Sequence, residues 1–147
     1  MSSKYVREQT ISFITDNLPS EEDVIDLTAE FDEMNDLLDS SGVTYEDNWL
    51  GCQFIGTDEN PIAVGNRDYR ESGSIFLHVV APAKKGVRAS LIDRAEAIRD
   101  AFRGKRQNDV VFESVTPPNF EAAATLQFQD GWTACSVIVN YYRDLHT

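Results

Sequence analysis

The sequence has 147 residues, is 41% hydrophobic and 26% charged, and carries a formal net charge of −12 at pH 7. These values are typical of an ordinary globular domain that is large enough for one core. No apolar run approaches the roughly 20 residues that a membrane-spanning helix needs, and the N-terminus lacks the apolar centre of a signal peptide. We therefore expect a single domain, residues 1–147, that is made in the cytoplasm and contacts no membrane.

The charge is distributed unevenly along the chain. Residues 1–60 contain 15 Asp and Glu against 2 Lys and Arg, a net of −13, whereas residues 61–147 contain 10 against 11, a net of +1. A chain this acidic repels nucleic acid at long range, which argues against sequence-specific DNA binding. Basic residues nevertheless cluster at residues 84–88 and 99–106. They are either a solvated turn with cations that complement a helix C-terminus, or a basic surface for an acidic partner or a neighbouring copy.

Residues that could carry chemistry are few and scattered. The sequence contains no phosphate-binding glycine loop, no nucleophile elbow, and no zinc or calcium motif. His78 lies in an apolar strand-like run, where a hydrogen-bonded histidine is more typical than a general base. Cys52 and Cys135 lie in apolar stretches, which favours two buried free thiols over a disulfide. We therefore expect no enzymatic activity, no cofactor and no metal ion.

Two helices are predicted in the acidic N-terminal part, residues 1–42. Residues 5–18 fit a helix loosely and also alternate like a strand, and helix is the preferred interpretation. Ser20 is a candidate N-cap followed by acidic residues, and apolar residues then recur at three- and four-residue steps up to Leu38. This pattern predicts a helix from Ser20 to about Gly42. Its acidic face is either a solvated surface or a docking or cation-binding surface.

The next segment is predicted to contain one strand and then irregular structure. Residues 51–55 read as a strand, and Thr-Asp-Glu-Asn-Pro at 57–61 is typical of a turn. Residues 65–74 are charged and contain glycines, which predicts a loop or an extended hairpin arm. The segment has no apolar period of its own, so we expect it to become ordered against a neighbouring subunit.

A strand, a helix and a hairpin are predicted in the last part of the chain. Residues 74–80 form an apolar run that Pro82 ends, because proline cannot donate to a strand ladder. Residues 110–115 form another strand, and 124–128 is predicted to pair with 132–142 across Asp-Gly. A helix that ends at Gly104 is predicted from apolar residues on one face: Leu91, Ala95, Ile98 and Phe102.

These elements predict an α+β fold. We expect residues 43–147 to form a four- to five-stranded, mostly antiparallel sheet plus an amphipathic helix, with two or three helices packed on the sheet in total. Trp49 and Trp132 are expected to be core anchors, because a large aromatic ring beside a turn usually buries its surface.

Several short sequence motifs follow one another in a definite order between about Val43 and Tyr142. They are Trp49; Arg70-Glu71-Ser72-Gly73 leading into Ile75 to Pro82; Asp93-Arg94-Ala95 with Ile98 and Phe102-Arg103-Gly104; and Gly131-Trp132 with Val137, Val139 and Tyr141. In order and spacing they resemble the tail terminator proteins of long-tailed bacteriophages, also called minor tail or tail completion proteins. The first forty residues depart from the pattern of that family.

The resemblance implies a structural virion protein with a tail-tube-like fold. Tail terminators form a ring of six copies on the head-proximal end of the tail tube, end its growth, and join it to the head-completion proteins. Genomic DNA passes through the ring without specific binding. Candidate residues for contacts between subunits are Arg67, Arg70, Glu71, Lys84, Lys85 and Arg88. Candidate acidic residues that face the lumen are Glu21, Glu22, Glu46 and Asp47.

Other functions stay open at this point. A head–tail connector or a tail tube subunit would share a related architecture. A protein from a different class, an acidic adaptor domain that docks a basic partner through its capped helix, would remain monomeric or dimeric. Oligomeric state and affinity for a tail tube distinguish these hypotheses.

Overall fold

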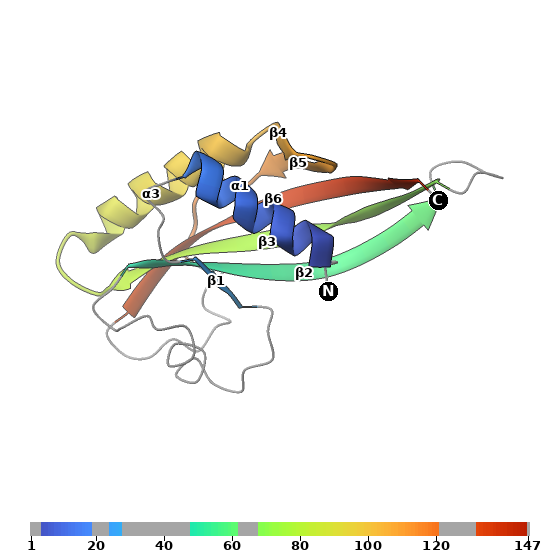
Figure 1. The fold of residues 1–147 in the computed structure, drawn as a ribbon. Coiled ribbons are helices and arrows are strands. Elements are labelled where there is room, and N and C mark those ends of the chain that lie inside the picture. The colour runs from blue at the N-terminus through green and yellow to red at the C-terminus, as the bar shows by residue number, and fades with distance from the viewer. Residues whose placement is uncertain (1–3, 19–23, 28–47, 62–67, 121–131, 147) are drawn as a thin grey trace.

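The computed structural model describes residues 4–18, 24–27, 48–61, 68–120 and 132–146, with the backbone alone for 56–61, 68 and 146. This part of the chain is α+β, with two helices over one face of a six-stranded sheet (Figure 1). The helices are α1 (Lys4–Asn17) and α3 (Val87–Phe102). The strands are β1 (Val24–Asp26), β2 (Trp49–Pro61), β3 (Asp68–Pro82), β4 (Lys105–Gln107), β5 (Val110–Val115) and β6 (Trp132–His146).

The strand order is β1-β2-β3-β6-β5-β4. All neighbouring pairs are antiparallel except β1 and β2, which are parallel, so the sheet is mixed. The predicted fold class is confirmed, but the sheet has more strands than the four to five expected. The edge strands β1 and β4 have three residues each, too few to give an alternating sequence pattern.

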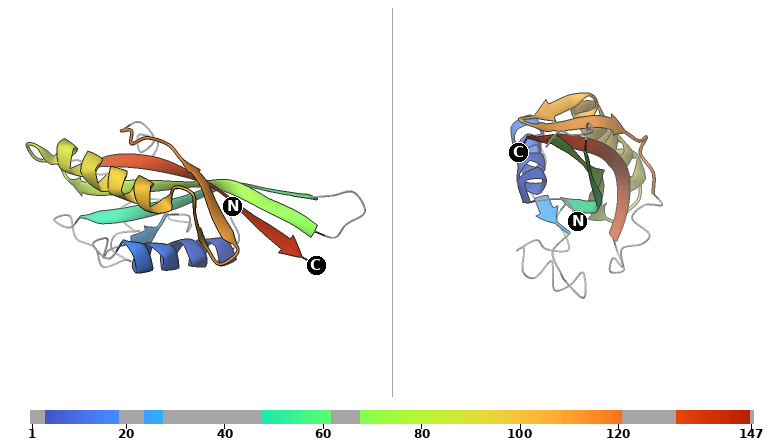
Figure 2. Two further views of the ribbon diagram at one scale, coloured as in Figure 1. Left: turned by 90° about the horizontal axis from the view of Figure 1, so that it is seen from above. Right: turned by 90° about the vertical axis from the view of Figure 1, so that its right-hand side faces the viewer.

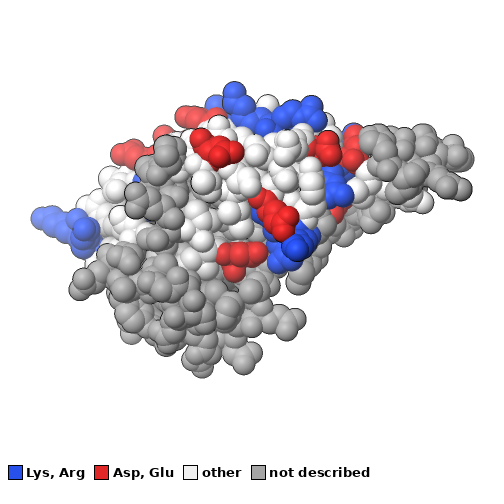
Figure 3. Space-filling model, viewed as in Figure 1, with Lys and Arg blue, Asp and Glu red and all other residues white. Residues whose placement is uncertain are grey.

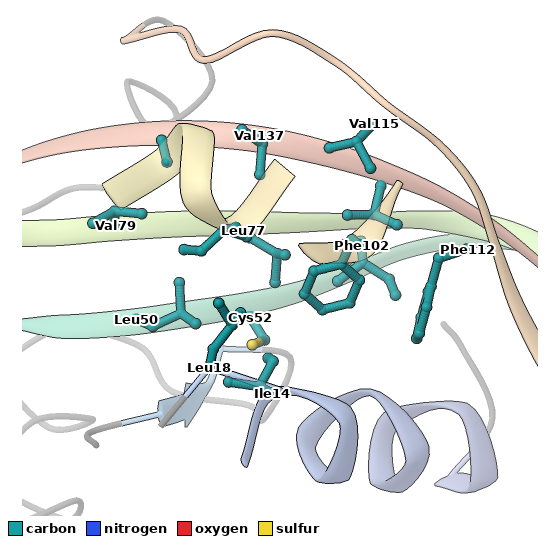
Figure 4. Packing of buried hydrophobic residues seen from close by; sticks show 14 of the residues in the cluster. Ile14, Leu18, Leu50, Cys52, Leu77, Val79, Phe102, Phe112, Val115 and Val137 are labelled. Carbon is teal, nitrogen blue, oxygen red and sulfur yellow. The ribbon is translucent and has the colours of Figure 1, made fainter. Parts of the chain in front are cut away.

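The larger hydrophobic core lies between the helices and the sheet. Successive side chains of a strand point to opposite faces, so alternate residues of β2, β3 and β6 face α1 and α3 (Figure 4). Rings from α1, α3 and β5 meet there, with centroid distances of 4.6 Å for Phe13–Phe102, 5.0 Å for Phe13–Phe112 and 4.8 Å for Phe102–Phe112. The prediction that Leu91 and Phe102 belong to the core is confirmed, since both are fully buried.

A smaller hydrophobic cluster covers one end of the opposite sheet face. Trp49 of β2 is 1% exposed and packs edge-on against Trp132 of β6, with ring centroids 5.6 Å apart. Trp49 is thus the predicted core anchor, whereas Trp132 is only half-buried at the margin of the cluster. Ile25, Val80 and Ala134 complete the buried part of this cluster.

The N-terminal predictions are partly confirmed. Residues 4–17 form a helix, as preferred for 5–18. The helix predicted to start at Ser20 is wrong where the structure describes it, because Val24–Asp26 is strand β1. The β-branched residues Val24 and Ile25 pair in parallel with β2, and Ile25 is buried in the smaller cluster, which outweighs the local helical pattern. The rest of that predicted helix lies outside the described residues.

The long strands of the sheet correct a second prediction. The turn at 57–61 is wrong, because β2 continues to Pro61. Of the two alternatives for 65–74, the extended hairpin arm is confirmed from Asp68 onward, where β3 begins and pairs antiparallel with β2, and the loop is wrong there. Neighbouring backbones decide this region, since residues of β3 such as Glu71 pair with β2 on one side and β6 on the other. The ends of β2, β3 and β6 project beyond the helices as an arm, which is visible in Figure 1 and in the left view of Figure 2. We define the arm as residues 55–61, 68–74 and 140–146.

Proline and glycine residues lie at the ends of the remaining elements, as the sequence indicates. β3 ends at Pro82, and α3 begins after Gly86, whose φ of 81° is in the left-handed region. Gly104, with φ of 70°, follows α3 and allows the chain to enter β4. The predicted strand at 110–115 is confirmed as β5. The predicted partner strand at 124–128 lies outside the described residues.

Candidate functional site

Arg70, a predicted subunit contact, is held within its own subunit. Its Nε donates to Asp144 Oδ1 at 2.8 Å and its Nη2 donates to Asp144 Oδ2 at 3.1 Å, linking β3 to β6. The guanidinium also lies 4.2 Å from the centroid of the Tyr142 ring. The hydrogen bond to Asp144 raises the pKa of Arg70. Arg70 therefore presents a fixed, partly exposed surface on the arm.

Glu71 does not lie on a loop surface as predicted. It is 5% exposed and lies near the start of β3, opposite Arg143 of β6. Strand pairing on both sides places it inside the arm. Its proposed role between subunits stays a prediction, as does that of Arg67, which lies outside the described residues.

The predicted basic turn is present at the start of α3. Lys84 and Lys85 are exposed between β3 and α3, and the backbone N–H of Val87 donates to the Lys84 carbonyl at 3.1 Å. Arg88 is exposed on the first turn of α3, with its guanidinium 4.3 Å from the centroid of the Phe120 ring. The structure thus brings these three cations together at one end of α3. The candidate lumen residues Glu21, Glu22, Glu46 and Asp47 lie outside the described residues.

A buried polar network crosses the sheet face that the helices leave uncovered. His78 of β3 contacts Ser136 of β6 at 2.6 Å through Nδ1, and Gln53 of β2 at 3.2 Å through Nε2. The Gln53 oxygen only accepts, so Nε2 carries the proton and Nδ1 accepts from the Ser136 hydroxyl. Burial lowers the pKa of His78 to about 4, which keeps the imidazole neutral at pH 7.

This network agrees with the expectation of a satisfied histidine in an apolar strand. The sequence did not predict its partners, because Gln53 and Ser136 become neighbours of His78 only through strand register. A second polar row lies further along the same face, where the Ser74 hydroxyl donates to the Asn140 oxygen at 2.9 Å and the Asn140 amide donates to Ser114 at 3.0 Å. These cross-strand bonds fix the register of β3, β6 and β5.

The cysteines are buried free thiols, as predicted. Burial raises the pKa of Cys52, which is fully buried, and also raises that of Cys135. Such thiols stay protonated and behave as small apolar groups. Within the described ranges, no group of three or more His, Cys, Asp and Glu residues is placed to hold a metal ion.

The two lateral edges of the sheet carry backbone groups that could meet another chain. β1 pairs with β2 only at residues 50–52, and the outer edge of β2 from Gln53 to Pro61 pairs with no strand that the structure describes. At the other edge, β4 pairs with β5 on one side, and no described strand pairs with its outer side, although α1 contacts this region and Asn108 Nδ2 donates to Gln9 Oε1 at 2.6 Å. Unpaired strand edges are common sites of contact with other chains.

The comparisons with known proteins bear on the fold. No family model matches the sequence, and no curated protein matches it significantly. Seven chains of solved structures match significantly. One of them, whose name states no function, aligns over 100% of this chain and 99% of its own length with a TM-score of 0.59 and 15% identity. At that identity the likeness shows a shared fold alone. None of the helices in the described part is long and apolar enough to span a membrane.

Proposed function

We propose that this protein is a non-catalytic structural protein of a bacteriophage virion, a tail terminator. In this proposal six copies form a ring on the head-proximal end of the tail tube, end its growth, and join it to the head-completion proteins. The acidic residues Glu21, Glu22, Glu46 and Asp47 are proposed to face the DNA conduit, where like charge keeps the duplex from adhering.

The resemblance of the sequence to tail terminator proteins supports this proposal. The motifs that carry the resemblance lie in four elements of the fold. Trp49 opens β2, residues 70–73 lie in the arm portion of β3, Asp93 lies in the first half of α3, and Trp132 opens β6. The large sheet covered by helices on one face is compatible with a tail-tube-like subunit.

The observation that carries the proposal is the projecting arm. Its strands continue the sheet beyond α1 and α3, and α1 reaches only its base, where the Tyr5 ring lies 4.2 Å from the Arg143 guanidinium (Figure 1). Ordering a residue costs about 1–2 kcal/mol of backbone entropy, which apolar burial must offset. Further out, Tyr69 and Arg70 are exposed, so this part of the arm gains more from contact with a second molecule. Such an arm is suited to a protein that functions as part of an assembly, because a neighbouring subunit can supply that contact.

The proposal is tested by electron microscopy of the purified protein mixed with the growing tail tube protein of the same virus. We expect tubes that stop short and carry a ring at one end. Long tubes built by this protein alone would identify a tube subunit instead. A protein that leaves tube length unchanged and binds no tube end would contradict the terminator proposal and favour a connector or an adaptor domain.

A further inference from the structure

The two lateral edges of the sheet are built from chain segments of opposite charge. From residue 8 to residue 66 the sequence contains 15 Asp and Glu and no Lys or Arg, and this stretch includes β1 and β2. From residue 84 to residue 106 it contains eight Lys and Arg against three Asp and Glu, and this stretch includes α3 and β4. β1 and β4 are the first and last strands of the sheet. The difference in charge between the two stretches of sequence therefore becomes a difference in charge between the two edges of the sheet.

The basic edge consists of Arg103, Lys105 and Arg106, at the end of α3 and in β4. All three are exposed, and Figure 3 shows Lys and Arg side chains over this part of the molecule. Arg103 pairs with Asp100 at 3.3 Å on the surface, and the Arg106 Nε donates to the Asn108 carbonyl at 3.1 Å. Exposed contacts of this kind contribute little to stability, so a stronger anionic partner can displace them.

The acidic edge is the outer edge of β2 within the arm, at Thr57-Asp58-Glu59-Asn60. Its inner side pairs with β3 throughout, from Thr57 opposite Gly73 to Asn60 opposite Arg70. Its outer side has no partner among the described strands, because β1 stops pairing at Cys52. Among the described residues, the acidic edge therefore offers backbone groups without a strand partner, together with two adjacent carboxylates in its sequence.

We propose that the basic edge of one copy docks on the acidic edge of a second copy of this chain. A second copy is the partner that fits, because each molecule carries an acidic edge and a basic edge on opposite sides of its sheet. Copies with a net charge of −12 repel one another overall, so stable contact requires a locally attractive pair of surfaces. A contact between two different surfaces is head to tail and generates a ring when the rotation closes.

This inference rests on the ring in the proposed function, and it names the surfaces that form it. The test uses two charge-reversed variants of the full chain. Lys105→Glu with Arg106→Glu makes both edges acidic, whereas Asp58→Lys with Glu59→Lys makes both edges basic. We expect each variant alone to self-associate about tenfold or more weakly than the wild type in sedimentation experiments at low salt. An equimolar mixture should recover association, because acidic edges then meet basic edges in alternation.

Ser90→Glu with Ala97→Glu is the control for net charge. It adds negative charge at two exposed positions of α3 that lie outside both edges and outside the candidate contacts Lys84, Lys85 and Arg88, and the proposal expects wild-type association from it. Raising the salt concentration should weaken wild-type association, since the surfaces are exposed to solvent. Thermal unfolding of each variant verifies that it is folded.

Three results would overturn the proposal. The first is equal weakening by the control, which would mean that association follows net charge. The second is no recovery in the mixture of two folded variants. The third is stronger association of Lys105→Ala with Arg106→Ala, because the cations would then protect an edge from pairing. Wild-type protein that remains monomeric at all concentrations would count against the ring itself, whereas associating wild type with unaffected variants would reject only these surfaces.

Discussion

Gly51 of β2 lies directly against two side chains of the smaller hydrophobic cluster, Leu27 and Trp49. A Cβ atom at this position would lie 2.7 Å from Leu27 Cδ1 and 2.9 Å from Trp49 Cζ3. Contacts this short force neighbouring atoms to move. The Leu27 side chain could rotate, but the Trp49 ring is buried against Trp132 and has less room. The site therefore requires glycine because of packing.

The substitution Gly51→Ala should lower the free energy of unfolding by about 1–3 kcal/mol, as overpacking of a core does. Urea denaturation of the two proteins measures the difference. The second substitution Leu27→Ala in the Gly51→Ala background should restore part of the loss by removing the nearer clash. An unchanged unfolding midpoint in Gly51→Ala would show that the cluster tolerates the added methyl group.

His78 is the residue at which pH should act on stability. Its pKa in the folded protein is lowered to about 4 by burial, whereas an unfolded histidine titrates near 6.5. Between these values the unfolded chain binds more protons than the folded one. Stability from the neutral histidine is therefore present above about pH 6.5 and is lost as the pH falls toward 4.

The substitution His78→Gln should reduce this pH dependence. Between pH 7 and about pH 4.5, the wild type should lose up to about 3 kcal/mol more of its unfolding free energy than the variant. Urea denaturation across this pH range measures how the unfolding free energy of each protein changes with pH. Both proteins contain the same carboxylates, so the difference between them reports the contribution of His78. Parallel pH profiles would show that His78 is accessible to protons in the folded state.

At the scale of elements, the aromatic contact of α1, α3 and β5 joins the helices to the sheet. Phe13, Phe102 and Phe112 come from three separate elements, and each ring contacts the other two. A residue at this junction stabilises three elements at once. Loss of its ring should therefore affect the whole domain.

Truncation of Phe102 to alanine should cost about 3–5 kcal/mol of unfolding free energy, because it removes a buried ring and leaves a cavity. Ile92→Ala on the same helix is the matched control, since Ile92 is 36% exposed and should lose far less. Chemical denaturation compares the two. Equal losses would mean that α3 is held through contacts other than this junction.

The arm is the element whose stability depends most on pairs at its surface. Arg70 and Asp144 are 47% and 33% exposed, and exposed ion pairs contribute little to stability. The substitution Arg70→Ala should therefore leave the global unfolding free energy nearly unchanged. Amide exchange should nevertheless become faster at residues 69–72 and 142–145, where local opening limits protection. Unchanged exchange in the arm would show that its backbone ladder suffices without the ion pair.

At the scale of the whole molecule, the sheet divides the protein into two unlike sides. One face carries both helices and the main core, whereas the other carries the small cluster and two rows of polar side chains from β2, β3, β5 and β6. The edges differ as well, because β2 belongs to an acidic stretch and β4 to a basic one. A molecule with unlike edges is suited to head-to-tail contact between copies, which is the contact that we propose for a ring.

Sequence patterns predicted the elements in which burial follows a regular period. The helix face through Leu91 and Phe102, the strand that ends at Pro82, and the buried thiols are all confirmed. These features depend on residues close together in the chain, so local spacing was sufficient. The helix at Ser20 and the turn at 57–61 failed, because pairing with a distant strand outweighed a polar or helical local pattern.

The sequence by itself determined the α+β class, the positions of α1, α3, β5 and much of the central sheet, and the division of charge along the chain. Only the tertiary structure decided the six-strand order, the length of the arm, and the contacts of His78 with Gln53 and Ser136. The physical reason is strand register. It brings together residues far apart in the chain, such as Arg70 and Asp144, which are 74 positions apart, and such pairing leaves no periodic signal in the sequence.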